Sequence, residues 1–584
     1  MTIIQRFFSN KRLNHIGVSF PLCVLNLLFM HYYLYFSNCL ESRTDVTTFV
    51  DNTCGILLDV SILFFTSFLF ITKNNRIPCI ICFVITWIWS FSNVLYSRFF
   101  HHYLTISAIS QGKAISDGII IRCIIDNIIW IDVYFILIVL LFLFITKSQK
   151  IEAIIIRKRV FLYLICLLFV VELSVHACYV FVNSTSSNWG YYRYRMNTIH
   201  ANMNRYSLQP NYIHFVRGSF RALFIDIYNS INGTITLSEE KKAEIESYIK
   251  SSRNNISGKY ISKPENIIFI LIESYMSFVS DIRINGLEVT PFLNSLQHDP
   301  SVYFNRHMQE NVTIGESSDG QFIYVTGLLP LHSRITISKA KDNTLPSLPK
   351  LMKRESRMII PTISSMWEQD EMCTKYGFMD LFTSFDYSGK HGDDLNDEQV
   401  FQLAMQKDIE SHERFFSFII TMSMHQPYTE QMDTTFHIST SKTISNELAC
   451  YLNACHYTDQ QIKNYFNHLK LRNIYDNSLI VIASDHAVHC SDFGGVCQEL
   501  PFYIINAKGL PKDMMWNKRC NQVDVYPTLI DILGIKCDWN GFGNSLLSNK
   551  FADSISEKKW ELSRWIILSD YFSSIGQNYV FSTN

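Results

Sequence analysis

The chain has 584 residues and a formal net charge of -1 at pH 7. It carries no basic patch with interleaved aromatic residues, so nucleic acid is not an expected partner. Hydrophobic residues make up 48% of the chain, and most of the excess lies in its first third. This uneven distribution predicts a membrane part followed by a more polar part, and the length allows more than one domain.

Five apolar segments occupy the first third, each near the ~20 residues that cross a bilayer as a helix. They lie at residues 14–37, 54–72, 77–97, 128–146 and 160–182. We therefore expect residues 1–182 to form a transmembrane bundle of five helices in the cell (inner) membrane. Basic residues before the first span, between the second and third, and between the fourth and fifth predict cytoplasmic flanks. An odd number of spans then places the chain after about residue 183 on the extracytoplasmic side.

Acidic residues inside these apolar segments allow a second interpretation of the membrane part. Asp59, Asp132 and Glu172 either line a transport path or satisfy one another within the bundle. After the last segment, residues 183–262 are polar and lack strand patterns, which indicates a connector. Ser238 followed by acidic residues predicts the start of a helix there.

Cysteine spacing allows disulfides in the exported part, because that compartment is oxidising. Cys490 with Cys497, and Cys450 with Cys455, lie close enough in sequence to be considered. Seven cysteines fall in the exported part, so at least one thiol there stays unpaired.

From about residue 263 onward, strand patterns alternate with helical ones, which predicts an α/β domain with a mixed, mainly parallel sheet between helices over residues 263–584. Three apolar runs end in groups that can do chemistry. Residues 266–272 stop at Glu273, residues 415–421 lead to His425, and residues 479–483 lead through Ser484 to Asp485 and His486. Open α/β sheets place their chemistry at the carboxyl ends of strands, so these side chains should converge on one site.

The converging groups suit a metal-assisted reaction. Glu273, Asp485 and His486 offer the mixed oxygen and nitrogen ligands that Mn²⁺, Mg²⁺ and Zn²⁺ all accept. Residues 315–322 supply hydroxyl groups where a loop enters a helix, a position that also holds phosphate or sulfate oxygens. Ser317 is the expected nucleophile, with Ser318 and Thr313 as competitors.

Four motifs give the exported part a resemblance to the sulfatase and alkaline-phosphatase superfamily, and within it to the lipoteichoic acid synthase branch of membrane-anchored phosphoglycerol transferases. The motifs are residues 266–274, the Gly-x-Thr-Ser-Asp-like loop 315–319, Tyr-Leu-Asn-Ala-Cys-His-Tyr-Thr-Asp at 451–459, and Ser-Asp-His at 484–486. The five spans fit the same architecture.

The resemblance implies a role for each matched position. It makes Ser317 the catalytic nucleophile, which also contacts the metal, and it makes Glu273, Asp485 and His486 the other metal ligands. It favours Mn²⁺ as the single divalent cation, before Mg²⁺ or Zn²⁺. It places His425 and Trp367 at the substrate side of the site.

Two positions depart from the phosphoglycerol transferase pattern. That pattern has a His-Gly-Asp shortly before the tryptophan and an arginine two residues after it, whereas this chain has residues 361–366 without that motif and Gln369 at the later position. The headgroup therefore stays open between phosphoglycerol and phosphoethanolamine. Formylglycine-dependent sulfatases need x-Pro-x-Arg after the modified residue, and Ser317 is followed by Ser-Asp-Gly-Gln, which disfavours a true sulfatase.

The expected function is metal-dependent transfer of a phosphate-linked headgroup through a covalent Ser317 intermediate. The expected partners are a membrane phospholipid as donor and a hydroxyl of a cell-envelope glycan or lipid as acceptor. The alternatives are a sulfatase-like hydrolase or phosphodiesterase, in which water replaces the acceptor, and an inactive binding protein. The sequence does not predict an oligomeric state.

Overall fold

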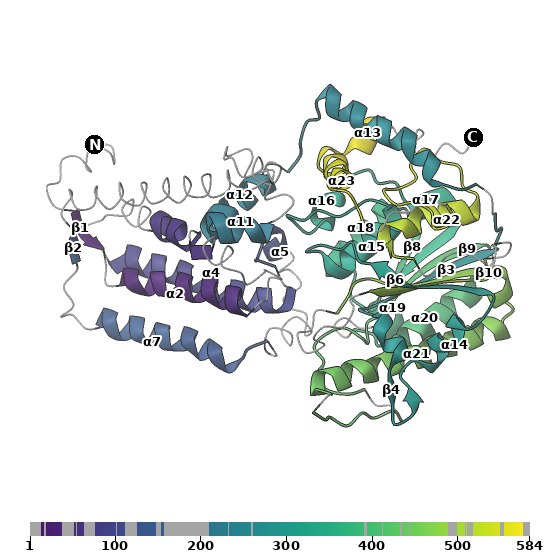
Figure 1. Ribbon diagram of the computed structural model, residues 1–584, viewed down its shortest axis with the longest axis horizontal. Coiled ribbons are helices and arrows are strands. Elements are labelled where there is room, and N and C mark those ends of the chain that lie inside the picture. The colour runs from purple at the N-terminus through teal and green to yellow at the C-terminus, as the bar shows by residue number, and fades with distance from the viewer. Residues whose placement is uncertain are drawn as a thin grey trace. The chain divides into compact units, whose positions relative to one another are not determined.

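A computed structural model of the chain (Figure 1) forms two compact units. The first unit comprises Met1–Ser110 and Ile124–Ile231, and the second comprises Gln111–Cys123 and Asn232–Asn584. Residues that the sequence assigned to a connector are thus divided between the units. The structure describes residues 13–16, 19–37, 52–53, 55–63, 76–100, 102–110, 125, 127–147, 154–156, 210–231, 233–258, 261–389, 394–411, 413–432, 435–442, 444–488, 499–507, 510, 518–548 and 554–575.

The first unit is built from apolar helices whose aromatic side chains interlock. Its longer helices are α2 (Ser19–Phe36), α4 (Arg76–Phe100) and α7 (Val133–Lys147). Phe29 of α2 stacks on Tyr134 of α7 at 4.0 Å between ring centroids, and Phe83 of α4 stacks on Phe142 of α7 at 3.9 Å. The unit also contains β1 (Leu13–Ile16), α5 (Ile106–Ser110), η2 (Trp130–Asp132), β2 (Ile154–Ile156), α11 (Pro210–Arg217) and α12 (Ser219–Ile231).

Three of the five predicted spans are seen as helices in the described part of the first unit. Within that part, Ile80–Arg98 is the one helix that is both long and apolar enough to cross a membrane, and Phe20–Phe36 and Trp130–Thr146 are shorter apolar helices. The segment at 54–72 is described only for residues 55–63, which are helical, and the segment at 160–182 lies outside the described residues. The count of five spans therefore stays a prediction.

A mixed sheet of eight strands forms the centre of the second unit. Within the sheet only β11 runs antiparallel to its neighbours β10 and β6, so the predicted mainly parallel character is confirmed. The strands are, in spatial order, β12 (Cys520–Asn521), β6 (Val302–Gln309), β11 (Leu500–Ile505), β10 (Ser478–Ser484), β3 (Asn266–Ile272), β9 (Phe415–Ile420), β7 (Glu355–Ile359) and β8 (Asp380–Phe382). Every residue of β3, β9 and β10 is buried, because helices cover both faces of the sheet.

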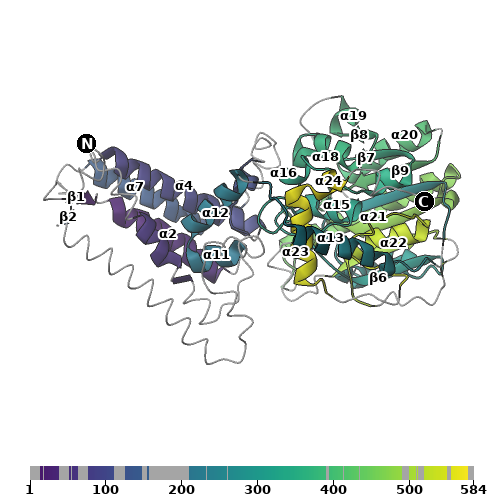
Figure 2. The same cartoon turned by 90° about the horizontal axis from the view of Figure 1, so that it is seen from above.

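Helices form a layer on each face of this sheet (Figure 1). One layer contains α15 (Glu316–Thr326), α16 (Ile337–Ala340), α17 (Leu348–Met352), α18 (Gln369–Tyr376), α22 (Val525–Leu533) and α23 (Glu557–Ser569). The other contains α14 (Pro291–Gln297), α19 (Ser384–Ser388), α20 (Asp397–Glu410) and α21 (Asn446–Leu471). Helix α13 (Glu239–Ser252) lies outside the first layer (Figure 2), where an ion pair joins Glu244 to Lys558 of α23.

The remaining short elements are α24 (Tyr571–Ile575), the hairpin of β4 (Arg283–Ile284) and β5 (Leu287–Glu288), and five 3-10 turns. These turns are η3 (Arg253–Asn255), η4 (Ser277–Asp281), η5 (Met366–Glu368), η6 (Tyr475–Asn477) and η8 (Gln522–Asp524).

Local sequence signals place several helix ends correctly. Ser238 caps α13, its hydroxyl accepting the N–H of Lys241, as its spacing from the acidic residues predicts. The pairing of Cys450 with Cys455, one of the two that the spacing allowed, is not formed, because both thiols are free and buried. Five residues on one helix place two side chains ~140° apart around the axis, which keeps them from meeting. Cys490 and Cys497 lie outside the described residues.

Substitution of Gly327, the residue that follows α15, tests how closely the end of this helix must approach Tyr526. Its φ is 68°, and a Cβ there would lie 2.5 Å from the ring of Tyr526. Gly389, which ends α19, is the matched control, because its φ is 65° and nothing lies within 4 Å of a Cβ. We expect Gly389→Ala to cost about 1 kcal/mol for the left-handed backbone alone. Gly327→Ala should cost about 2 kcal/mol more, because the added carbon overpacks the core.

The measurement is thermal unfolding of the detergent-solubilised chain. If both variants lost the same amount of stability, the contact of residue 327 with Tyr526 would be unimportant.

Candidate active site

The site begins where two neighbouring parallel strands end together. Strand β10 pairs with β3 in register, so that Ser484 lies opposite Ile272. The pairing continues one step beyond, since the Asp485 N–H donates to the Ile272 carbonyl at 3.1 Å. Glu273 and Asp485 therefore leave the sheet side by side and at the same level.

Helix α15 brings a hydroxyl to these acids from one face of the sheet. Gly315 precedes the helix, and Glu316 starts it with a left-handed φ of 46°. The Ser317 Oγ then lies 3.2 Å from Glu273 Oε2 and 3.1 Å from His486 Nε2.

The competing hydroxyls have other partners. Ser318 Oγ donates to the Gly315 carbonyl at 2.6 Å, and Thr313 Oγ1 donates to Asp319 Oδ2 at 2.7 Å. Asp319 is fully buried and also accepts the N–H groups of Thr313 and Gly315, so it shapes the loop before the helix. Within this loop, Ser317 is thus the hydroxyl that contacts the acid and histidine cluster.

The cluster buries three ionisable groups within a few ångströms of one another. Burial and the neighbouring charge of Glu273 raise the pKa of Asp485 well above its usual range. Burial acts on Glu273 in the same direction, but hydrogen bonding to His486 and the charge of that ring hold the Glu273 pKa well below its usual range. Burial alone would lower the pKa of His486, yet the charges of Asp485 and Glu273 raise it. The two acids therefore compete for one positive partner.

The geometry and chemistry of the cluster fit a divalent cation. Glu273, Asp485 and His486 each offer one ligand atom, and these atoms lie within 4.8 Å of one another. Asp485 Oδ1 accepts the N–H groups of Ser274 and His486, whereas the buried Oδ2 has no hydrogen-bond partner in the described part of the chain. His486 Nε2 lies 3.7 Å from this oxygen, at ion-pair distance. A buried carboxylate oxygen that accepts no hydrogen bond is costly unless something positive lies beside it.

A second set of contacts fixes the ends of the strands. The Glu273 N–H donates to Thr421 Oγ1 at the end of β9, and the Ser274 hydroxyl donates to Glu273 Oε1 at 2.9 Å. Gln522 donates to the Asp485 carbonyl at 2.6 Å, and Tyr324 of α15 donates to the Ser484 carbonyl at 2.7 Å. Apart from the bond between Ser274 and Glu273 Oε1, these bonds act on backbone groups, so they hold the strand ends in place without occupying the carboxylate oxygens.

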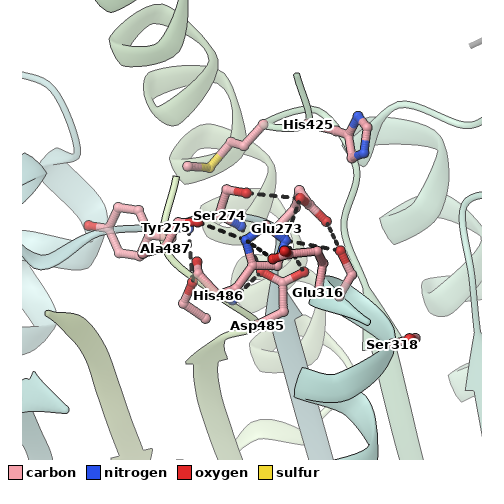
Figure 3. A network of polar contacts seen from close by, with 12 residues as sticks. Glu273, Ser274, Tyr275, Glu316, Ser318, His425, Asp485, His486 and Ala487 are labelled. Atoms are coloured by element: carbon pink, nitrogen blue, oxygen red, sulfur yellow. Dashed lines mark hydrogen bonds and ion pairs between the residues drawn. The ribbon is translucent and has the colours of Figure 1, made fainter. Parts of the chain in front are cut away.

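His425 lies beside the cluster, on the loop after β9 (Figure 3). Its charge is among the influences that lower the Glu273 pKa, after burial and His486. Asp397 at the start of α20 is fully buried and holds this loop, because its Oδ1 accepts the N–H groups of Met422 and Ser423 at 2.8 and 2.9 Å. The structure thus places His425 on a braced loop near the acids.

Trp367 is half-buried, and no contact described for this part of the chain joins it to Glu273, Asp485 or His486. Trp367 and Glu368 both have left-handed φ values, 50° and 53°. The next residue, Gln369, is buried and donates to Gln321 Oε1 at 2.8 Å. Gln321 is one helical turn from Ser317 and therefore on the same face of α15.

Sequence reasoning missed several residues that hold the site together, including Thr421, Asp397, the Gln321–Gln369 pair and Gly320. Gly320 had a usable signal, because a glycine inside a helix often marks a close approach. A Cβ at Gly320 would lie 2.6 Å from the Asp485 carbonyl oxygen. The other residues make contacts with residues far away in the sequence, and no local sequence pattern predicts such contacts.

Comparisons with known proteins agree with this architecture. A sulfatase family model matches residues 265–535, and a model of the lipoteichoic acid synthase N-terminal domain matches residues 1–189. Lipoteichoic acid synthase 2 of Bacillus subtilis is 26% identical over 553 residues, which cover 87% of this chain and 80% of that protein. In its sequence and in the order of its two matched domains, the chain is similar to the lipoteichoic acid synthase-like enzymes of the sulfatase family.

Two further proteins show similarity to the chain. Lipoteichoic acid synthase of Staphylococcus aureus is 26% identical over 493 residues, covering 78% of this chain and 73% of that protein. The membrane protein lipooligosaccharide phosphoethanolamine transferase A of Neisseria meningitidis matches with a TM-score of 0.47 and 12% identity, covering 89% of this chain and 96% of that one. As in the lipoteichoic acid synthase-like family, the N-terminal part of the chain is its membrane anchor.

Gly320→Ala tests whether α15 must touch the end of β10. The new Cβ meets backbone atoms of Asp485, so the helix has to move and carry Ser317 away from Glu273 and His486. A shift of ~1 Å should lower the rate of cleavage of a chromogenic phosphodiester about 100-fold. Gly389→Ala, far from the cluster in sequence and without neighbours within 4 Å, should keep the wild-type rate. An unchanged rate in Gly320→Ala would disprove this requirement.

Proposed function

We propose that this chain transfers a phosphate-linked headgroup, phosphoglycerol or phosphoethanolamine, from a membrane phospholipid to a hydroxyl of a cell-envelope glycan or lipid. The observation that carries the proposal is the position of Ser317 Oγ, 3.2 Å from Glu273 Oε2 and 3.1 Å from His486 Nε2. A nucleophile in such a buried acid and histidine cluster suits attack on phosphorus. The membrane anchor favours a lipid donor over a soluble ester.

A divalent cation bound by Glu273, Ser317, Asp485 and His486, with Mn²⁺ favoured over Mg²⁺ or Zn²⁺, would stabilise negative charge on the phosphate oxygens. Four such groups offer oxygen and nitrogen ligands that all three ions accept. Asp485 Oδ2, which is buried and accepts no hydrogen bond in the described part of the chain, supports this assignment.

The reaction proceeds in two steps on the Ser317 oxygen, after its hydroxyl proton has been lost to solvent. In the first step the Oγ–P bond forms and the bond from phosphorus to the diacylglycerol oxygen breaks. His425 gives its proton to that departing oxygen. In the second step the acceptor oxygen bonds to phosphorus, the Oγ–P bond breaks, and the acceptor proton passes to His425. Protons and bonds are then restored for the next cycle.

The donor headgroup depends on the residues at the substrate side of Ser317. We assign Trp367 to this side, because it precedes by two residues Gln369, which bonds to Gln321 one helical turn from Ser317. Gln369 and Gln321 are uncharged, so this pair offers no cation for the phosphate. The headgroup stays open between the two, since glycerol offers hydroxyl groups and ethanolamine offers an ammonium group.

The covalent step can be tested by the intact mass of the full chain in lipid bilayers, supplied with Mn²⁺ and either phosphatidylglycerol or phosphatidylethanolamine. We expect a mass increase of one headgroup phosphate, which names the donor. Ser317→Ala should abolish the adduct and lower transfer by on the order of 1,000-fold or more. Ser318→Ala is the matched control, because its neighbouring hydroxyl faces the Gly315 carbonyl instead, and it should keep the adduct. Cleavage without any adduct would favour a hydrolase.

Metal removal tests the ligand assignment separately. Adding Mn²⁺ to the chelator-treated chain should raise its unfolding temperature, because an ion that binds only the folded state stabilises it. The Asp485→Asn variant should lose most of this increase in unfolding temperature. The substitution replaces a carboxylate, one of whose oxygens accepts no hydrogen bond in the described part of the chain, by an uncharged amide. Thermal scans with Mn²⁺, Mg²⁺ and Zn²⁺ would rank the ions. A full increase in the Asp485→Asn variant would refute the assignment.

A further inference from the structure

Helix α12 (Ser219–Ile231) has two faces of different character. One face is buried in the first unit, where Ala222 and Ile225 pack against Ile213 of α11. The other face is a stripe of large apolar side chains that are exposed. We call Phe224, Ile227, Tyr228 and Ile231 the α12 stripe, and their exposed fractions are 68%, 39%, 47% and 78%. Spacings of three, four and seven residues put them on one side of the helix.

A buried carboxylate fixes which way this stripe faces. Asp59 is fully buried and accepts the N–H groups of Ser219 and Phe220 at 2.8 and 2.9 Å, which caps the start of α12. His31 of α2 lies 2.9 Å from the same carboxylate. A carboxylate is favourable at a helix N-terminus, and it would be costly to leave it buried without these partners.

Two more contacts hold the same face of the helix. The indole N–H of Trp89 in α4 donates to Ser219 Oγ at 2.5 Å. Further along α12, the Asp226 carboxylate accepts the N–H of Ile106 at 2.6 Å. With both its start and its middle fastened to the first unit, α12 cannot roll to bury the stripe.

Helix α12 is too short to cross a membrane. Its 13 residues extend ~20 Å, whereas the hydrocarbon core of a bilayer is ~30 Å thick. It does contact α4, whose outer surface is apolar and exposed at Ile85 and Ile88. In a membrane unit an exposed apolar surface of this kind faces lipid, and the stripe on α12 has the same character in the same unit. Beyond residue 231 the chain enters the second unit with the acidic start of α13.

We propose that α12 lies along the membrane surface and that the α12 stripe inserts into the boundary between lipid headgroups and acyl chains. Short helices with one apolar face bind membranes in this way, and tyrosine is enriched at that depth. The partner is therefore bilayer lipid. This inference goes beyond the proposed headgroup transfer, since it depends on the anchor and not on Ser317.

Site-specific photocrosslinking of the full chain in lipid nanodiscs tests this contact. Benzoylphenylalanine would replace Phe224, Tyr228 or Ile231, all of which are exposed, so the replacements should not disturb folding. Leu140 on the exposed side of α7 is the control for lipid contact, and exposed Leu471 at the end of α21 is the control for water. After illumination, mass spectrometry should find lipid adducts at 224, 231 and 140 but not at 471.

Every other result would overturn the proposal. A product of twice the chain mass would assign the stripe to a second copy, and a crosslink to residues 233–575 would assign it to the second unit. No adduct at 224 and 231 would mean that the stripe faces water.

The role of Asp59 in orienting the helix has its own test. Asp59→Ala removes the acceptor of the Ser219 and Phe220 N–H groups, so it should lower the lipid adduct at 224 several-fold while the adduct at 140 stays unchanged. An unchanged adduct at 224 would show that another contact orients α12. Because Ser317 plays no part in these experiments, their outcome is independent of the transfer reaction.

Discussion

Two carboxylates buried side by side are the constraint on which the second unit depends. Glu273 and Asp485 leave adjacent strands at the same level, and both are almost fully buried. Like charges at such a distance raise one another's free energy unless a positive group lies between them. His486 supplies part of that compensation, and the Asp485 oxygen that accepts no hydrogen bond in the described part of the chain leaves room for more. The surrounding structure is arranged to keep this unfavourable pair together.

The supporting contacts mostly act on the backbone and not on the reactive atoms. Thr421, Gln522 and Tyr324 bond to main-chain groups at the strand ends. Gly320 lets α15 approach the Asp485 carbonyl closely enough to place Ser317 over the acids. Because these bonds act on the main chain, they fix the positions of the carboxylates and the imidazole and leave their side-chain atoms available for an ion and a substrate.

The sequence predicted the parts of the fold that follow from local chemistry. Uninterrupted apolar runs identified β3, β9 and β10, since a parallel sheet covered on both faces needs such strands. Ser238 marked the start of α13 because a cap is a local hydrogen bond. The acids and His486 were found because each ends an apolar run. The structure gathers Glu273, Ser317, Asp485 and His486 within hydrogen-bond or ion-pair distance.

Contacts between distant parts of the chain could not be predicted in the same way. The pairing of Gln369 with Gln321, and the bracing of the His425 loop by Asp397, depend on which helix faces which loop. Proximity in sequence also left a disulfide between Cys450 and Cys455 open, but one continuous helix carries both residues and keeps their side chains apart.

The position of β3 in the sheet has a consequence for how the protein matures. Its neighbours are β9 and β10, so residue 266 pairs with residue 478, and residue 267 with residue 416. Both partners are synthesised long after β3, and until they arrive the apolar strand Asn266–Ile272 has two open edges. Open edges of that composition invite pairing with other chains. A nascent or truncated chain that stops before residue 484 should therefore need a chaperone outside the membrane, or be degraded there.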